Sequence, residues 1–109
     1  MKRGEVWTAA GGHAYGGRPR PVVIIQDDRF DATDSITVCP LTADATSARI
    51  FRVGIEPGSG NGLRKRSYAM TDKIASIPKA RVRHRLGRLD DEDIASLNRA
   101  VLAFLGLAG

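Results

Sequence analysis

The chain has 109 residues, of which 42% are hydrophobic and 27% charged, with a formal net charge of +5; this balance is typical of one globular domain over residues 1–109 and excludes a disordered chain. Its single cysteine excludes a disulfide framework. The sequence has no secretory signal pattern and no apolar run long enough to cross a bilayer, so we expect a cytoplasmic protein without membrane contact.

Positive charge is concentrated in the body of the chain, and negative charge near its end. Residues 64–88 hold nine basic residues and one acid, Asp72, whereas residues 90–93 are all acidic. A small basic domain is typical of proteins that bind nucleic acid, because Lys and Arg neutralise phosphates. The alternative is a positive surface that is merely solvated.

Three segments in the first half of the chain predict β-strands. Gly4–Ala10 and Ser35–Leu41 have strand composition. Pro21–Gln26 (PVVIIQ) is a continuous apolar run rich in β-branched residues, which predicts a strand buried on both faces. Cys39 has apolar neighbours in the third segment, so we expect a buried structural thiol.

The second half predicts shorter strands. Arg49–Glu56 alternates between two faces. Ser67–Asp72 and Lys73–Ile77 are two short strands or one bent strand. Arg81–Leu89 alternates arginine with apolar residues, as a half-exposed edge strand does, although a helical turn through Lys79–Val82 fits equally well.

The last segment predicts a helix. Asp90 is a good N-cap, and the acids that follow it complement the helix dipole. Apolar residues recur at helical spacing at Ile94, Leu97, Val101, Phe104 and Leu105. This stripe predicts a core or dimer contact, and Gly106 is a typical helix stop. The fold class is mainly β with a C-terminal helix: a small, strongly bent antiparallel sheet or barrel closed by that helix.

Five segments follow one another in an order that makes the sequence specific. They read KRGEVW, RPVVIIQDD, VCPLT, DKIASIPKARV and LGRLDDEDIASLNRAVLAFLGL, between Lys2 and Leu107. As a set, they resemble the MazF/PemK family of toxin endoribonucleases. The resemblance implies an SH3-like barrel of the CcdB/MazF plasmid-maintenance-toxin type and a homodimer. It also implies metal-independent, sequence-selective cleavage of single-stranded RNA without a cofactor, and an antitoxin whose acidic segment wraps the toxin.

The implied reaction is a transesterification in which the ribose 2′-OH attacks its own phosphate, leaving a 2′,3′-cyclic phosphate and a 5′-OH end. It needs a proton acceptor, a group that stabilises the charged phosphorane, and a proton donor. Arg20 matches the arginine of the family's RPV motif. Its planar guanidinium suits two phosphate oxygens, so we assign it transition-state stabilisation, with proton donation as a second role. The alternative is an arginine that only fixes the loop.

Two further residues match family positions near this arginine. Thr42 ends the VCPLT segment, where its hydroxyl and backbone N–H can hold a phosphate oxygen or cap the strand's own turn. His13 lies in the first loop, where some relatives carry a proton-transferring histidine, and its ordinary pKa of about 6.5 suits a proton acceptor. However, its spacing to Arg20 differs from the family's. Ala14 and Tyr15 also replace a Glu-Gln pair that many relatives carry, so His13 as a surface residue is the alternative.

Asp72 matches the acid of the family's D-(K/Q)-I motif. Because it stands alone in a basic stretch, it should be ionised and paired; it orients a catalytic group, acts as the base, or forms a structural salt bridge. Met70 replaces an arginine that contributes to catalysis in some relatives. A second arginine must therefore come from elsewhere, and Arg64 and Arg66 are the candidates.

RNA binding is assigned to the loops around one face of the barrel. Tyr15 and Phe30 are expected to stack on unpaired bases, whereas Trp7 and Phe51 are expected to pack in the core or an interface. The expected polar and phosphate contacts are Arg18, Gln26, Arg29, Arg49, Arg64 and Arg66.

Two other functions compete with the nuclease. The same fold serves gyrase poisons, whose activity depends on the end of the terminal helix, and a non-catalytic RNA-binding barrel would bind RNA without cutting it. The presence of both Arg20 and Thr42 favours the nuclease. The expected substrate is single-stranded messenger RNA, with transfer RNA and ribosomal RNA as alternatives.

Overall fold

The computed structural model describes residues 1–11, 18–45 and 51–107. Seven strands, three 3-10 turns and one helix make up the described chain. The strands are β1 (Glu5–Ala9), β2 (Arg20–Ile24), β3 (Ser35–Thr42), β4 (Val53–Ile55), β5 (Ser67–Ala69), β6 (Ala75–Pro78) and β7 (Val82–Arg88). The turns and the helix are η2 (Asp28–Phe30), η4 (Thr71–Lys73), η5 (Lys79–Arg81) and α1 (Asp91–Phe104).

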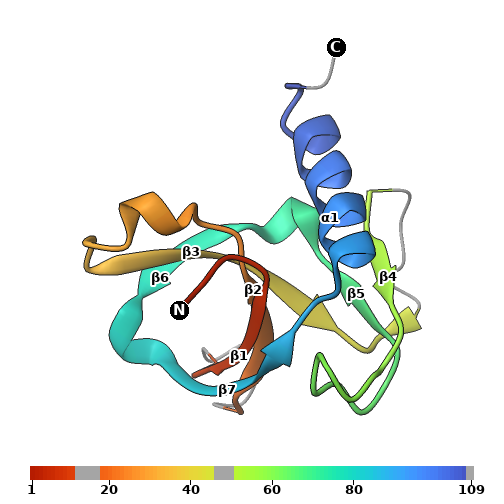
Figure 1. The fold of residues 1–109 in the computed structure, drawn as a ribbon, viewed down its shortest axis with the longest axis horizontal. Helices are drawn as coiled ribbons and strands as arrows, with labels where there is room; N and C mark the ends of the chain where they lie inside the picture. The colour runs from red at the N-terminus through yellow and green to blue at the C-terminus, as the bar shows by residue number, and fades with distance from the viewer. Residues whose placement is uncertain (12–17, 46–50, 108–109) are drawn as a thin grey trace.

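All strand pairs are antiparallel, and the sheet runs in the order β4-β5-β3-β2-β1-β7. β3 is long enough to pair with two strands on one edge: its first half pairs with β6, and its last two residues pair with β5. The sheet therefore bends sharply around β3, with α1 standing at one end (Figure 1). The predicted bent antiparallel sheet with a terminal helix is confirmed.

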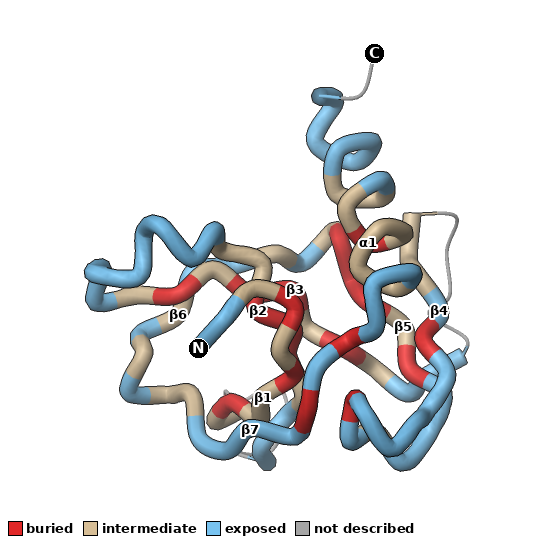
Figure 2. Tube along the Cα trace, in the orientation of Figure 1, coloured by how far each residue is buried: buried red, intermediate tan, exposed pale blue. Residues whose placement is uncertain are grey.

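β2 is buried on both faces, as its composition predicts, because its alternate residues enter two different apolar clusters. Val23 packs in the larger cluster, which includes Leu97 of α1. Val22 and Ile24 pack in a smaller cluster on the other face, with Val38 of β3. Buried segments accordingly concentrate where β1, β2 and β3 run side by side (Figure 2). The buried body of β2 holds its first residue, Arg20, at the rim of the sheet.

α1 begins as predicted but packs along only part of its stripe. The Asp90 side chain accepts a hydrogen bond of 2.7 Å from the backbone N–H of Asp93, as an N-cap does. Leu97 is only 2% exposed, whereas Phe104 and Leu105 lie on the exposed last turn (Figure 2). These two residues keep the helical spacing, but the helix outruns the sheet that would bury them.

In three regions the structure decides between element boundaries that the sequence left open. The predicted strand Arg49–Glu56 is reduced to β4, with residues 46–50 outside the described residues. η4 divides the region after Ser67 into two strands, β5 and β6. Both readings of the region after Pro78 hold, since η5 leads directly into β7.

The remaining predictions about packing concern three side chains. Cys39 is fully buried and unpaired, and burial raises the pKa of its thiol to about 12, as expected for an inert structural thiol. Trp7 packs against the smaller cluster, and the Phe51 ring lies 5.3 Å from that of Phe104. Within the described chain, no helix has the length and apolar character needed to span a membrane.

Candidate active site

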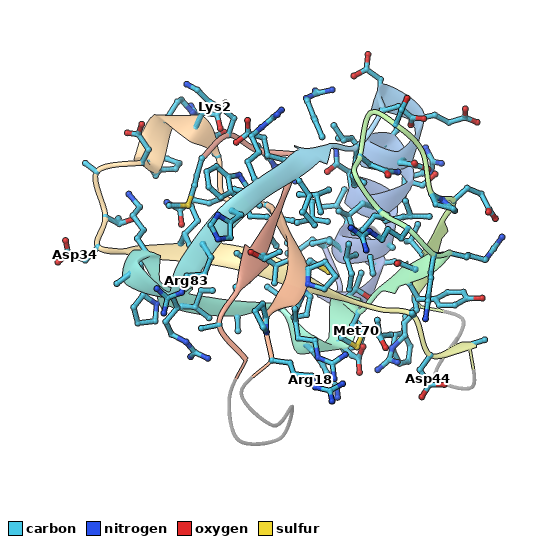
Figure 3. The ribbon with its side chains drawn as sticks, turned by 90° about the horizontal axis from the view of Figure 1, so that it is seen from below. Lys2, Arg18, Asp34, Asp44, Met70 and Arg83 are labelled. Carbon is cyan, nitrogen blue, oxygen red and sulfur yellow. The ribbon has the colours of Figure 1, made fainter. Side chains whose placement is uncertain are left out.

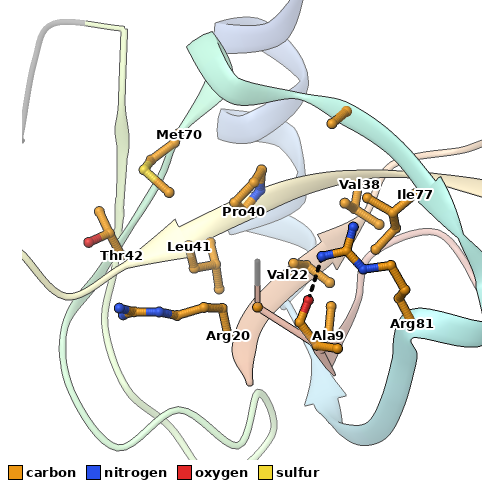
Figure 4. Close-up of a pocket in the computed structure, with 13 residues that line it drawn as sticks. Ala9, Arg20, Val22, Val38, Pro40, Leu41, Thr42, Met70, Ile77 and Arg81 are labelled. Atoms are coloured by element: carbon orange, nitrogen blue, oxygen red, sulfur yellow. Dashed lines mark hydrogen bonds between the residues drawn. The ribbon is translucent and has the colours of Figure 1, made fainter. Parts of the chain in front are cut away.

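A pocket of about 130 Å³ opens on the sheet face that carries the smaller cluster. Its floor follows the register of three strands, since Ala9 pairs with Arg20 and Val22 pairs with Pro40. The described residues that line the pocket are Ala9, Ala10, Gly11, Arg20, Val22, Val38, Pro40, Leu41, Thr42, Met70, Ala75, Ile77 and Arg81. It is thus an apolar hollow with arginine side chains at its margin (Figure 4).

Arg20 and Thr42 lie at the same end of this pocket (Figure 4). Continuing the β2–β3 register by two residues beyond Val22 and Pro40 places Arg20 opposite Thr42, so both side chains stand on one face. The Thr42 hydroxyl oxygen accepts a hydrogen bond of 3.2 Å from the backbone N–H of Asp44. That bond caps the strand end, and it leaves the hydroxyl hydrogen free to be donated into the pocket.

Arg81 stands at the opposite end of the pocket, where the sequence did not predict a functional arginine (Figure 4). Its guanidinium donates a 2.8 Å hydrogen bond to the carbonyl oxygen of Ala10. The backbone N–H of Ala10 in turn donates to the carbonyl oxygen of Arg81, also at 2.8 Å. This double link ties η5 to the end of β1. Since 71 positions separate the two residues, no local sequence signal could have revealed it.

Asp72 forms a fork with Arg52 and is not among the described residues lining the pocket. Arg52 Nε and Nη2 donate to the two carboxylate oxygens, each at 3.1 Å. The Arg52 side chain is 6% exposed and that of Asp72 is 22% exposed. These hydrogen bonds lower the pKa of Asp72 below its ordinary value, so it is ionised and paired as expected. The geometry favours the salt-bridge interpretation over a catalytic one.

Gln26 and Arg29 lie beyond the far end of β2, whose last residue, Ile24, is already roughly 13 Å from Arg20 at the usual rise along a strand. The Gln26 side chain donates to the Phe30 carbonyl at 2.8 Å and accepts from the Thr37 backbone N–H at 3.0 Å. Arg29 pairs with Asp27. Gln26 thus organises the loop around η2, and the structure does not bring these residues together with Arg20.

Two further predicted arginines are placed differently. Arg64 lines a separate hollow with Pro21 and Ala43, and because successive residues of a strand point to opposite faces, Pro21 does not share the face of Arg20. Arg18, just before β2, lies on the same edge of the molecule as Met70 and Asp44 (Figure 3). Met70 itself is 5% exposed and lines the pocket, so its position carries an apolar wall here.

Arg66 pairs with Glu56 and lies over the ring of Tyr68. A side-chain hydrogen bond with Tyr68, and then the negative charge of Glu56, raise the pKa of Arg66 above its ordinary value. Three residues that the sequence assigned to RNA or to chemistry, His13, Tyr15 and Arg49, lie outside the described residues. No group of His, Cys, Asp and Glu side chains within residues 1–11, 18–45 and 51–107 could hold a metal ion.

Comparison with solved structures defines the class of the fold. The chain matches the Mycobacterium tuberculosis toxin MazF-mt6 with a TM-score of 0.77 at 22% identity, over 96% of this chain and 99% of that one. A mycobacterial endoribonuclease solved with its cognate antitoxin gives a TM-score of 0.83 at 22% identity, over 100% of this chain and 98% of that one. The fold is therefore that of the MazF toxin structures.

Sequence comparison narrows the class to a family. Residues 2–105 match the model of the PemK-like, MazF-like toxin of type II toxin–antitoxin systems. The chain is 50% identical to a probable endoribonuclease MazF of Mycolicibacterium smegmatis, and the match covers 100% of both chains. It therefore belongs to the PemK-like, MazF-like toxin family, as the five sequence segments and their order along the chain indicated.

Proposed function

We propose that this chain, as a single toxin domain over residues 1–109, is an endoribonuclease that cleaves single-stranded RNA. The observation that carries the proposal is the placement of Arg20 and Thr42 together at the end of a pocket. The family match and the relative that is 50% identical and named a probable endoribonuclease support it. Arg18, two residues before Arg20 in the chain, and Arg81 at the other end of the pocket add the positive charge that an RNA backbone requires.

In the proposed reaction, the 2′-oxygen forms a new bond to phosphorus while the bond from phosphorus to the 5′-oxygen breaks. The Arg20 guanidinium donates two parallel hydrogen bonds to the non-bridging oxygens, whose charge grows as the phosphorane forms. Thr42 donates its hydroxyl hydrogen to one of these oxygens. The 2′-OH proton goes to a base, for which His13 remains the prediction. The departing 5′-oxygen takes up a proton from Arg20, in its second role, or from water, and becomes the 5′-OH; solvent then returns the proton to Arg20.

Two partners belong to the proposal. The solved mycobacterial relative is described as a complex with its cognate antitoxin, and a Deinococcus radiodurans relative is described as MazE-MazF. By analogy, this toxin is neutralised by a cognate antitoxin. The homodimer that the family resemblance implies is the second partner, and the apolar residues exposed at the end of α1 are the surface that it would cover. The basic surface around the pocket suits an acidic antitoxin segment as well as RNA.

The test is cleavage of single-stranded RNA by the purified protein in EDTA, with the ends identified by sequencing. We expect cyclic phosphate and 5′-OH ends. Arg20→Ala should lower kcat by roughly 10²- to 10³-fold, the usual loss for one stabilising donor. Arg20→Lys should recover part of it, because lysine keeps the charge but loses the planar fork.

Arg99→Ala is the matched control, since this exposed arginine on α1 contacts Ser96 of its own helix. Full activity of folded Arg20→Ala would remove Arg20 from the mechanism. Activity that disappears in EDTA would contradict metal independence. Intact RNA together with trapped gyrase–DNA complexes would show the gyrase-poison alternative, and RNA binding without cleavage would show the non-catalytic one.

A further inference from the structure

A row of paired residues runs from the Arg20 end of the pocket toward the outer strands of the sheet. Thr42 on β3 pairs with Tyr68 on β5, and Tyr68 pairs with Gly54 on β4. Directly paired residues of antiparallel strands point to the same face, so Tyr68 stands beside Thr42 on the face that carries Arg20. With neighbouring strands about 4.8 Å apart, Tyr68 lies roughly 10 Å across the sheet from Arg20.

A guanidinium group covers the Tyr68 ring, and a glycine makes room for it. Arg66 Cζ lies 5.5 Å from the centroid of the Tyr68 ring, and Arg66 also pairs with Glu56 on the connection after β4. A methyl group at Gly54 would stand 2.6 Å from Arg66 Nη2. The missing side chain therefore leaves the space that the guanidinium occupies. The Arg66 side chain is 55% exposed, so the pair presents a cationic aromatic surface to solvent.

We infer that Arg66 and Tyr68 form a stacking platform for the base of the nucleotide next to the scissile phosphate, an inference that rests on the proposed function. Unpaired RNA bases stack on aromatic rings and on guanidinium planes. A phosphate held at Arg20 and Thr42 brings the adjacent base within reach of the next strand, where Tyr68 stands. The ligand is thus an unpaired nucleobase, and a purine gives the larger stacking surface.

A purely structural role for this pair makes a different prediction. If Arg66 and Tyr68 only joined β4 to β5, replacing Tyr68 would lower the stability without making cleavage depend on one particular base of the RNA. The decisive measurement is therefore whether the KM for cleavage depends on the base at one particular position of the RNA, with kcat measured alongside it.

The experiment uses a single-stranded RNA that the wild-type protein cleaves, synthesised with an abasic ribose at each position flanking the cleavage site in turn. For wild-type protein, one abasic position should raise KM roughly tenfold to a hundredfold, the usual worth of one stacked base, with little change in kcat. Tyr68→Leu should show that raised KM with the intact RNA, and the abasic change should have no further effect. Tyr68→Phe keeps the ring and should keep the wild-type KM.

Gly54→Ala tests the cation without touching the ring. The new methyl group displaces the Arg66 guanidinium, and KM should rise while the sensitivity to the abasic position persists through Tyr68. This variant and Tyr68→Phe carry the test if Tyr68→Leu does not fold. An unchanged KM in Gly54→Ala would remove Arg66 from the platform.

A binding measurement separates this inference from the proposed cleavage. An RNA with a 2′-deoxyribose at the cleaved position cannot form the cyclic phosphate, and 2-aminopurine at the sensitive position reports stacking by its loss of fluorescence. If no cleavage is found, 2-aminopurine is placed at each position of a bound RNA in turn. Quenching at one position by wild-type protein and Tyr68→Phe, but not by Tyr68→Leu, then supports the platform. Equal quenching by all three overturns it. Loss of quenching in Phe30→Leu instead assigns the stack to a different arginine–aromatic pair of the described residues, Arg29 and Phe30, and also overturns it.

Discussion

The fork between Arg52 and Asp72 gives the sharpest test of whether Asp72 acts in structure or in chemistry. Two hydrogen bonds of 3.1 Å join the pair. Removing one partner of a buried ion pair costs about 3–5 kcal/mol, and hydrogen bonds to charged groups contribute about 1.5–3 kcal/mol. The Asp72 side chain is 22% exposed, so losing this pair should cost less than losing a fully buried one. We therefore expect Asp72→Asn and Arg52→Met each to lower the free energy of unfolding by about 2–3 kcal/mol at pH 7.

The pH dependence has a definite sign. In the folded protein the pKa of Asp72 lies below its ordinary value of 3.8, mainly because of its side-chain hydrogen bonds with Arg52. The folded state therefore binds this proton less readily than the unfolded state does. Its contribution to stability is complete at neutral pH and is lost as the pH falls from about 4 through the lowered pKa. Asp72→Asn should flatten this part of the stability profile.

The assay is urea denaturation from pH 7 down to pH 2.5, combined with kcat of the folded protein at pH 7. Asp34→Asn is the matched control, because it makes the same carboxylate-to-amide change on an exposed loop. A salt-bridge role requires lower stability with an unchanged kcat. Wild-type stability in Asp72→Asn, or a folded variant that has lost cleavage roughly a hundredfold or more as general acid–base groups do, would refute the reasoning.

Two further predictions concern the larger apolar cluster. Leu97→Ala should lower the free energy of unfolding by about 3–4 kcal/mol, because it leaves a cavity between α1 and the sheet; in urea denaturation, Leu107→Ala on the exposed end should change it little, and equal effects would contradict the packing described. Cys39 should resist thiol reagents at pH 8, because burial raises its pKa to about 12. Labelling should follow unfolding in denaturant, and rapid labelling of the native protein would contradict its burial.

Predictions that depend on neighbours in the sequence were the ones that could be made in advance. The unbroken apolar run after Pro21 predicts a strand buried on both faces, and alternate residues of β2 do enter two clusters. Asp90 and the acids after it predict the start of the helix, and the Asp90 cap is present. In both cases the structure depends on residues within a few positions of one another, so the hydrophobic periodicity and the capping residue can be recognised from the sequence alone.

The candidate site divides along the same line. The position of Arg20 could be predicted because the strand that anchors it follows at once in the chain. The sequence could not show that Gln26 and Arg29 lie far from Arg20. A polar or charged residue type does not reveal where its side chain lies in space, whereas the two ends of β2 lie on opposite sides of the molecule. Asp72 was expected to be paired, but its partner Arg52 lies 20 positions away.

The sequence by itself therefore determined the kinds of elements, their order, the helix cap and the family, since each depends on local pattern or on segments read in order. Only the tertiary structure decided which residues share a face. Arg81 meets Ala10 across 71 positions, and Tyr68 stands beside Thr42 because β5 pairs with the last residues of β3. Strand register and the choice of neighbouring strands are set by the packing of distant segments, so the row that links Arg20, Thr42 and Tyr68 exists only once the sheet has formed.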